Sequence, residues 1–61
     1  MSLEELKEDA RRWATQMADR ELAARIRDYT YDGQPDLTTQ LYIRAFINEV
    51  ACRAVIERLG L

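Results

Sequence analysis

The chain of 61 residues contains no histidine, one cysteine (Cys52), one proline and two glycines. A single cysteine excludes an internal disulfide, and without histidine it also excludes a structural zinc site within one chain. The same shortage excludes a histidine general base and a Cys–His nucleophile pair. A di-iron bundle centre, which takes a Glu-x-x-His pair from each of two helices, is excluded as well. We therefore expect no cofactor and no metal.

A chain this short builds only a small hydrophobic core. The free energy gained by burying apolar surface is then about equal to the conformational entropy lost on folding. Small domains resolve this balance with disulfides, a bound metal, unusually good packing or self-association. The first two are excluded here, so packing and self-association remain. With 48% hydrophobic and 33% charged residues, residues 1–61 have the composition of a single folded domain.

The chain also lacks a large excess of either charge and has no long apolar run. Eleven acidic residues against nine basic ones give a net charge of −2, so we do not expect nucleic-acid binding through phosphate contacts. The longest uncharged stretches, residues 37–43 and 45–48, are far shorter than the roughly 20 residues that cross a bilayer. The acidic start Met1–Glu5 differs from the basic start of a signal peptide. We expect a cytoplasmic protein without membrane contact.

Helix breakers are concentrated at one place in the chain. Gly33 and Pro35 lie together, and no other glycine or proline occurs before Gly60. Residues 31–36 are therefore predicted to form a single turn between two long helices rich in Ala, Leu, Arg and Glu. The first helix opens with a capping box formed by Ser2 and Glu5. The second opens with Asp36 as N-cap and closes at Gly60, where a left-handed cap is expected.

The first segment carries two apolar stripes. The first stripe consists of Leu3, Leu6, Ala10, Trp13, Ala14 and Met17. After Asp19, a second stripe of Leu22, Ile26 and Tyr29 lies on a face rotated by roughly a third of a turn. Either the helix continues through a heptad stutter, or it ends near Ala18 and a new helix starts with Asp19 as N-cap. We favour one continuous helix, because no glycine or proline marks a break.

The second segment carries more apolar surface than one neighbouring helix can cover. One set of residues, at spacings of 4, 3, 4, 3 and 4, forms a heptad seam. This seam consists of Leu41, Ala45, Asn48, Cys52, Val55 and Leu59. A second stripe, well round the helix from the seam, consists of Ile43, Phe46, Ile47, Val50 and Ala54. Two apolar faces require two partners.

An antiparallel hairpin places the first helix over the second stripe, with Trp13 near Ala54. The heptad seam then stays uncovered, and a second copy of the chain is its natural cover. We therefore predict an all-α fold: an antiparallel hairpin of two long helices, with its turn near residues 31–36, that pairs into a homodimeric four-helix bundle. In topology alone this arrangement is similar to small RNA-binding regulators of the Rop type, and topology by itself implies no function.

Polar patterns in the chain are interpreted as structural. Four acidic residues near the start of the first helix (Glu4, Glu5, Glu8 and Asp9) complement the helix dipole. The series Asp28, Asp32 and Asp36 lacks the ligand pattern of a calcium loop and is assigned to turn and cap roles. Cys52, on an apolar face, is expected to be an inert small hydrophobe. For Asn48 two interpretations stay open: a polar residue that fixes the register of the seam, or one that faces water.

We predict a non-enzymatic interaction or regulatory module that acts through self-association. The seam residues form its predicted subunit interface, and its partner is a second copy of the chain or another protein. One alternative is a nucleic-acid-binding regulator that uses arginines of the first helix across the dimer, namely Arg11, Arg12, Arg20, Arg25 and Arg27. A remote alternative is a metal-dependent enzyme with carboxylates at the bundle interface.

Overall fold

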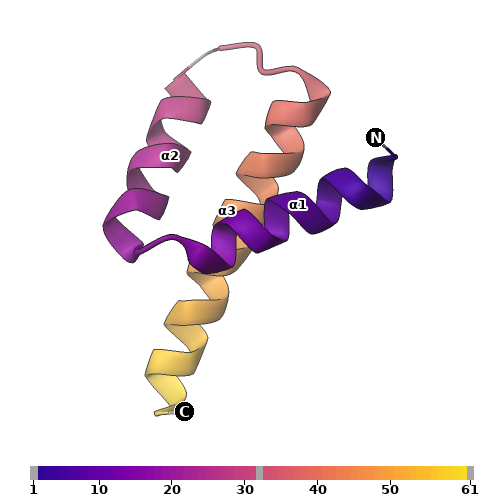
Figure 1. Ribbon diagram of the computed structural model, residues 1–61. Helices are drawn as coiled ribbons and strands as arrows, with labels where there is room; N and C mark the ends of the chain where they lie inside the picture. The colour runs from indigo at the N-terminus through magenta and orange to yellow at the C-terminus, as the bar shows by residue number, and fades with distance from the viewer. Residues whose placement is uncertain (1, 32, 61) are drawn as a thin grey trace.

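The computed structural model describes residues 2–31 and 33–60, and within these ranges the chain forms three helices (Figure 1). Helix α1 spans Leu3–Gln16, α2 spans Asp19–Tyr31 and α3 spans Leu37–Leu59. The prediction of an all-α chain is confirmed. The predicted hairpin of two long helices is wrong, because the first segment is divided into α1 and α2.

The helix ends follow the local signals in the sequence. The Ser2 hydroxyl accepts a hydrogen bond from the backbone N–H of Glu5 at 3.2 Å, and the Asp36 carboxylate accepts one from Thr39 at 2.8 Å. Gly60 closes α3 with φ 74°, a left-handed conformation that favours glycine. All three caps were predicted from the sequence. The predicted turn at residues 31–36 includes Asp32, which lies outside the described residues.

The predicted continuity of the first helix is corrected at Met17. This residue has φ −82° and ψ 143°, which is extended backbone, and the next helix begins at Asp19 without any glycine or proline. In one straight helix the two apolar stripes would face different directions. The break allows each stripe to pack separately against α3, which buries Met17 from the first stripe and Leu22 from the second.

One arginine of α3 stabilises this break. The Arg53 guanidinium donates hydrogen bonds to the backbone carbonyls of Ala14 at 3.1 Å and Met17 at 2.6 Å, near the C-terminal end of α1. It also bonds to the carboxylate of Asp19, the first residue of α2, at 2.7 Å, and to Glu49 at 2.9 Å. The last carbonyls of a helix have no partner within it, so a cation here both satisfies them and complements the helix dipole.

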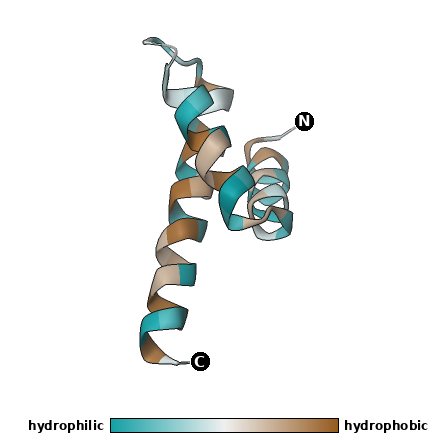
Figure 2. Ribbon diagram, turned by 90° about the vertical axis from the view of Figure 1, so that its left-hand side faces the viewer, coloured by the Kyte–Doolittle hydropathy of each residue, from teal (hydrophilic) through white to brown (hydrophobic). Residues whose placement is uncertain are grey.

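The core lies where α1 and α2 meet the first two thirds of α3. In Figures 1 and 2, α2 runs alongside this part of α3, and α1 crosses α3 near its middle. Leu22 and Phe46 are fully buried at the centre, with Ala14 and Met17 beside them. Three partly buried side chains pack around this cluster: Ile26, Tyr29 and Tyr42.

The predicted register between the first helix and α3 is wrong. Trp13 lies against Tyr42, with ring centroids 5.9 Å apart in an edge-on arrangement, and not near Ala54. The second stripe of α3 is accordingly covered only in part, because Phe46 is buried whereas Ile47 and Val50 are 49% and 43% exposed. The steep crossing of α1 leaves the end of α3 without a neighbour.

Residues 54–60, which we call the C-terminal arm, project beyond both other helices (Figures 1 and 2). Every residue of the arm is exposed, including its large apolar side chains Val55, Ile56 and Leu59. Along this part of the helix, brown hydrophobic segments alternate with teal hydrophilic ones (Figure 2). Among the described helices, none is long and apolar enough to cross a membrane.

Candidate functional site

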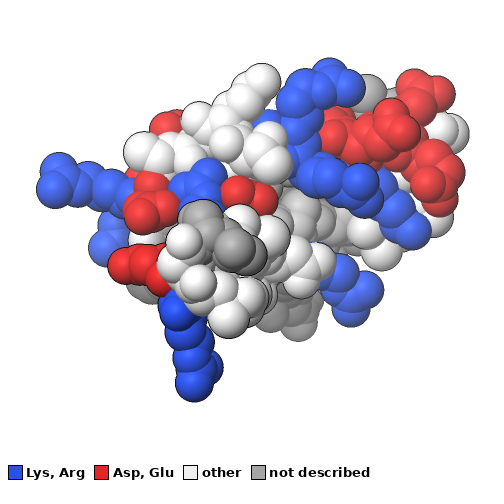
Figure 3. Space-filling model, turned by 90° about the horizontal axis from the view of Figure 1, so that it is seen from below, with Lys and Arg blue, Asp and Glu red and all other residues white. Residues whose placement is uncertain are grey.

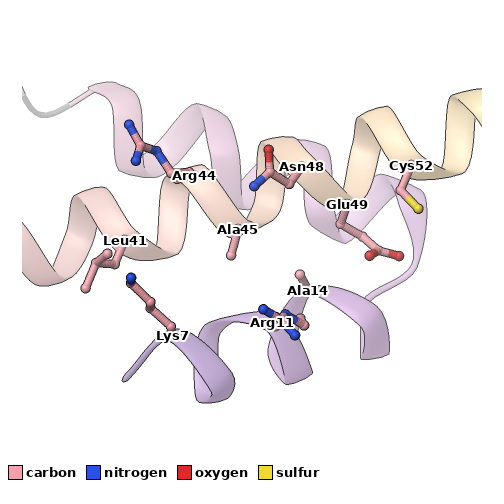
Figure 4. Close-up of a pocket in the computed structure, with 9 residues that line it drawn as sticks. All are labelled: Lys7, Arg11, Ala14, Leu41, Arg44, Ala45, Asn48, Glu49 and Cys52. Carbon is pink, nitrogen blue, oxygen red and sulfur yellow. The ribbon is translucent and has the colours of Figure 1, made fainter. Parts of the chain in front are cut away.

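An open groove of about 450 Å³ runs between α1 and α3 (Figure 4). Its apolar lining comes from Ala14 of α1 and from Leu41 and Ala45 of α3. Its other lining residues are Lys7, Arg11, Arg44, Asn48, Glu49 and Cys52. Alanines at the facing positions leave room between the two helices, because they carry no side chain beyond Cβ. The result is an apolar groove with charged edges.

The edges of the groove are mainly basic. Lys7 lies 3.9 Å from Glu4 of the same helix, whereas Arg11 and Arg44 form no ion pair within the part of the chain that the structure describes. The one acidic lining residue, Glu49, is bonded to Arg53. Arg53 in turn has a raised pKa, first because it bonds to Asp19 and then because it bonds to Glu49. The positive charge of the groove is therefore not offset by Glu49.

The predicted heptad seam lies along this groove and continues past it. Leu41, Ala45, Asn48 and Cys52 line the groove, and Val55 and Leu59 follow on the C-terminal arm. Leu41 and Ala45 are half-buried by α1, whereas the other four seam residues are exposed. The thiol of Cys52, expected on a buried apolar face, is thus accessible in the single chain. The chain itself therefore covers the seam only in part, and leaves its last four residues exposed.

Two of the five arginines of the nucleic-acid alternative, Arg25 and Arg27, lie against other side chains of the chain. Arg25 stacks over the Trp13 ring at 5.5 Å and lies 3.9 Å from Glu21. Arg27 lies 4.0 Å from its neighbour Asp28. Figure 3 shows one face of the molecule, on which basic side chains are scattered among acidic ones. A group of acidic side chains lies at the N-terminal end of α1. Phosphate contacts from a single basic stripe are therefore not favoured by this arrangement.

Acidic residues take structural positions in the described ranges. Asp9 accepts a hydrogen bond from the Tyr42 hydroxyl at 2.5 Å, and this bond, with some burial, raises the pKa of Tyr42. The Thr39 N–H bond lowers the pKa of Asp36, because it stabilises the charged carboxylate. Within residues 2–31 and 33–60, no group of three or more Cys, Asp or Glu side chains is placed to hold a metal ion.

Two features of this region were not identified from the sequence. The first is the role of Arg53, for which the sequence pattern predicted no contact. Two of its four hydrogen-bond partners are backbone carbonyls, and these have no sequence signal. The second is the basic edge of the groove, because Arg11 and Arg44 are 33 residues apart and meet only through the crossing of α1 over α3. The Glu49–Arg53 spacing of four is the one local hint.

Comparison with known proteins identifies no family. The chain matches no protein-family model, no curated protein and no solved structure.

Proposed function

We propose that this protein is a self-associating helical module that works as a homodimer, with the heptad seam of α3 at the subunit interface. The observation that carries the proposal is the amount of surface that the single chain leaves exposed. The chain has 4,965 Å² of accessible surface. A compact monomer of 7.1 kDa is expected to have about 4,100 Å².

The excess of about 900 Å² is close to the roughly 800 Å² that each partner buries in a standard protein interface. The C-terminal arm contributes apolar surface to this excess, since Val55 and Leu59 are 53% and 66% exposed. Burial of such side chains is the main favourable term in association. A second copy of the chain exposes the same surface, so one two-fold interface buries the exposed apolar surface of both copies.

The molar mass of the protein in solution tests this proposal. Light scattering after size exclusion is expected to give twice the chain mass of 7.1 kDa, with unfolding midpoints that rise with protein concentration. A folded species of 7.1 kDa at all concentrations would contradict the proposal.

A matched pair of variants locates the interface. Val55→Asp places a charge on the seam and is expected to give a folded monomer, because an unpaired charge is costly to bury at an interface. Ile47→Asp makes the same change at a residue of similar exposure (49% against 53%) that lies off the seam. This control is expected to remain a dimer. Equal effects of the two substitutions would place the interface elsewhere.

The nucleic-acid alternative predicts tight binding to DNA or RNA, whereas the proposed self-associating module predicts none. Labelled duplex DNA and structured RNA, titrated at about 150 mM salt, are expected to show no sub-micromolar binding. Tight binding that weakens in Arg11→Ala and Arg12→Ala would favour the regulator over the self-associating module.

A further inference from the structure

We infer that the two α3 helices of the dimer pair in an antiparallel manner about the level of Val50, so that the C-terminal arm of each copy fills the α1–α3 groove of the other. This inference rests on the proposed function, because it describes how the same seam is paired. It specifies which part of one chain is the ligand and which part of the second copy is the receptor.

The first support is the order of side chains along the seam. Under a two-fold axis at residue 50, Leu41 opposes Leu59, Ala45 opposes Val55, and Asn48 opposes Cys52. A two-fold interface requires this reciprocity, in which residue i contacts j and j contacts i. This pairing also places the small Ala45 against the larger Val55. At each end of the interface, Leu41 of one copy lies against Leu59 of the other, which suits close packing.

The second support is the distribution of covered and uncovered surface. The half of α3 that carries Leu41 and Ala45 is already flanked by α1 and α2, and what it offers is the groove. The C-terminal arm, which carries Val55 and Leu59, has no neighbour and offers a projecting helix with exposed apolar side chains. Antiparallel pairing brings each projection to a groove, twice in one dimer. Parallel pairing would bring the two arms to each other and leave both grooves empty.

The charges beside the seam do not rule out the antiparallel orientation. In a parallel seam, Arg44 flanks Glu49 of the second copy, which would normally favour that orientation. Glu49 is already bonded to Arg53 of its own chain at 2.9 Å, so this attraction is largely used within the chain. In the antiparallel seam, Arg44 instead flanks Arg58 of the second copy. Both side chains are exposed and extend into water, where like charges repel only weakly.

Cysteine cross-linking distinguishes the two orientations. The background is Cys52→Ala, which removes the native thiol. Into it we place Ala45→Cys in one chain and Val55→Cys in a second chain that carries a mass tag. A disulfide forms only when the two Cβ atoms come within about 4.5 Å. The two variants are mixed in equal amounts, equilibrated, oxidised mildly and weighed by mass spectrometry without reduction.

Antiparallel pairing is expected to give the mixed disulfide as the main product, with little self-linked product from either variant alone. Self-linked products that form at least as fast as the mixed one would overturn the inference in favour of parallel pairing. A dimer by mass that forms neither product would also overturn it, because the seam would then not be the interface.

A second pair guards against a local disturbance by the new cysteines. Leu41→Cys and Leu59→Cys, in the same background, are expected to give the same mixed product from the other end of the seam. The Cys52→Ala chain without further changes must first be shown to be a dimer by light scattering. If that chain and the unsubstituted protein are both monomers, the proposed function fails as well. If both are dimers, self-linked products overturn only the orientation, whereas the absence of both products also removes the seam from the interface.

Discussion

The two ends of α3 have similar apolar content and opposite environments. The first part, up to Arg53, contacts both other helices, buries Phe46 completely and anchors the α1–α2 junction. The C-terminal arm makes no such contacts, although it carries Val55, Ile56 and Leu59. The difference shows that hydrophobic content alone does not decide burial. A helix is buried only where another segment of the chain reaches it.

Truncation of Phe46 tests this comparison with the largest expected effect. Phe46→Ala removes a fully buried ring and is expected to cost about 3–5 kcal/mol of unfolding free energy. A core of this size supplies roughly that much, so the variant is expected to be largely unfolded at 25 °C. Val55→Ala is the control, and at protein concentrations where the chain is monomeric it is expected to change the unfolding free energy by no more than about 0.5 kcal/mol. Circular dichroism and urea titration at low protein concentration measure both, and equal losses would erase the distinction between the two parts of α3.

Replacement of Arg53 tests whether the helix break depends on this one side chain. Arg53→Met keeps the apolar stem and removes every hydrogen bond to Ala14, Met17 and Asp19. We expect a lower melting temperature and faster amide exchange at the start of α2 and the end of α1, because those carbonyls lose their partner. Arg58→Met, in the last turn of the same helix, is expected to change neither. Unaltered exchange at the junction in Arg53→Met would show that packing alone holds the break.

The bond between Tyr42 and Asp9 ties α1 to α3 near the groove. Tyr42→Phe is expected to cost about 1 kcal/mol, a typical value for one hydrogen bond. The raised pKa of Tyr42 means that its contribution is present below the ordinary tyrosine value near 10. It is lost as the pH rises through the raised value in the folded protein. Urea titrations between pH 8 and 11 measure this, with Tyr31→Phe as control because Tyr31 is 90% exposed. A pH profile shared by Tyr42→Phe and the unsubstituted protein would contradict the assignment.

The N-cap of α3 gives the smallest expected effect. The lowered pKa of Asp36 means that its charge-dependent contribution is present above the ordinary value of 3.8 and is lost as the pH falls through the lower folded value. Asp36→Asn keeps a capping oxygen. It is expected to reduce the loss of stability at acidic pH and to change stability little at pH 7. Unfolding midpoints from pH 2 to 5 report the difference. If Asp36→Asn loses stability at acidic pH as the unsubstituted protein does, that loss would be assigned to other carboxylates.

Sequence patterns predicted the helix ends better than the arrangement of the helices. Ser2, Asp36 and Gly60 act within one turn of their own positions, so their roles follow from local chemistry. The continuity of the first helix was predicted wrongly because no glycine or proline marks its break, and the rotation of the apolar stripe after Asp19 fits a stutter as well as a new helix. The break depends on carbonyl groups of α1 that are bonded by a side chain 36 residues away from Met17. The groove was missed for a related reason, since its basic edge forms only when α1 crosses α3.

The sequence by itself determined that the chain is helical, where α3 begins and ends, and that α3 has an apolar seam in addition to its core face. These follow from propensity, capping and periodicity, which act over a few residues. Only the tertiary structure decided that α1 and α2 are separate helices, that Trp13 meets Tyr42, and that the C-terminal arm projects without cover. These depend on which distant groups can satisfy one another in space, and no short stretch of sequence contains that information.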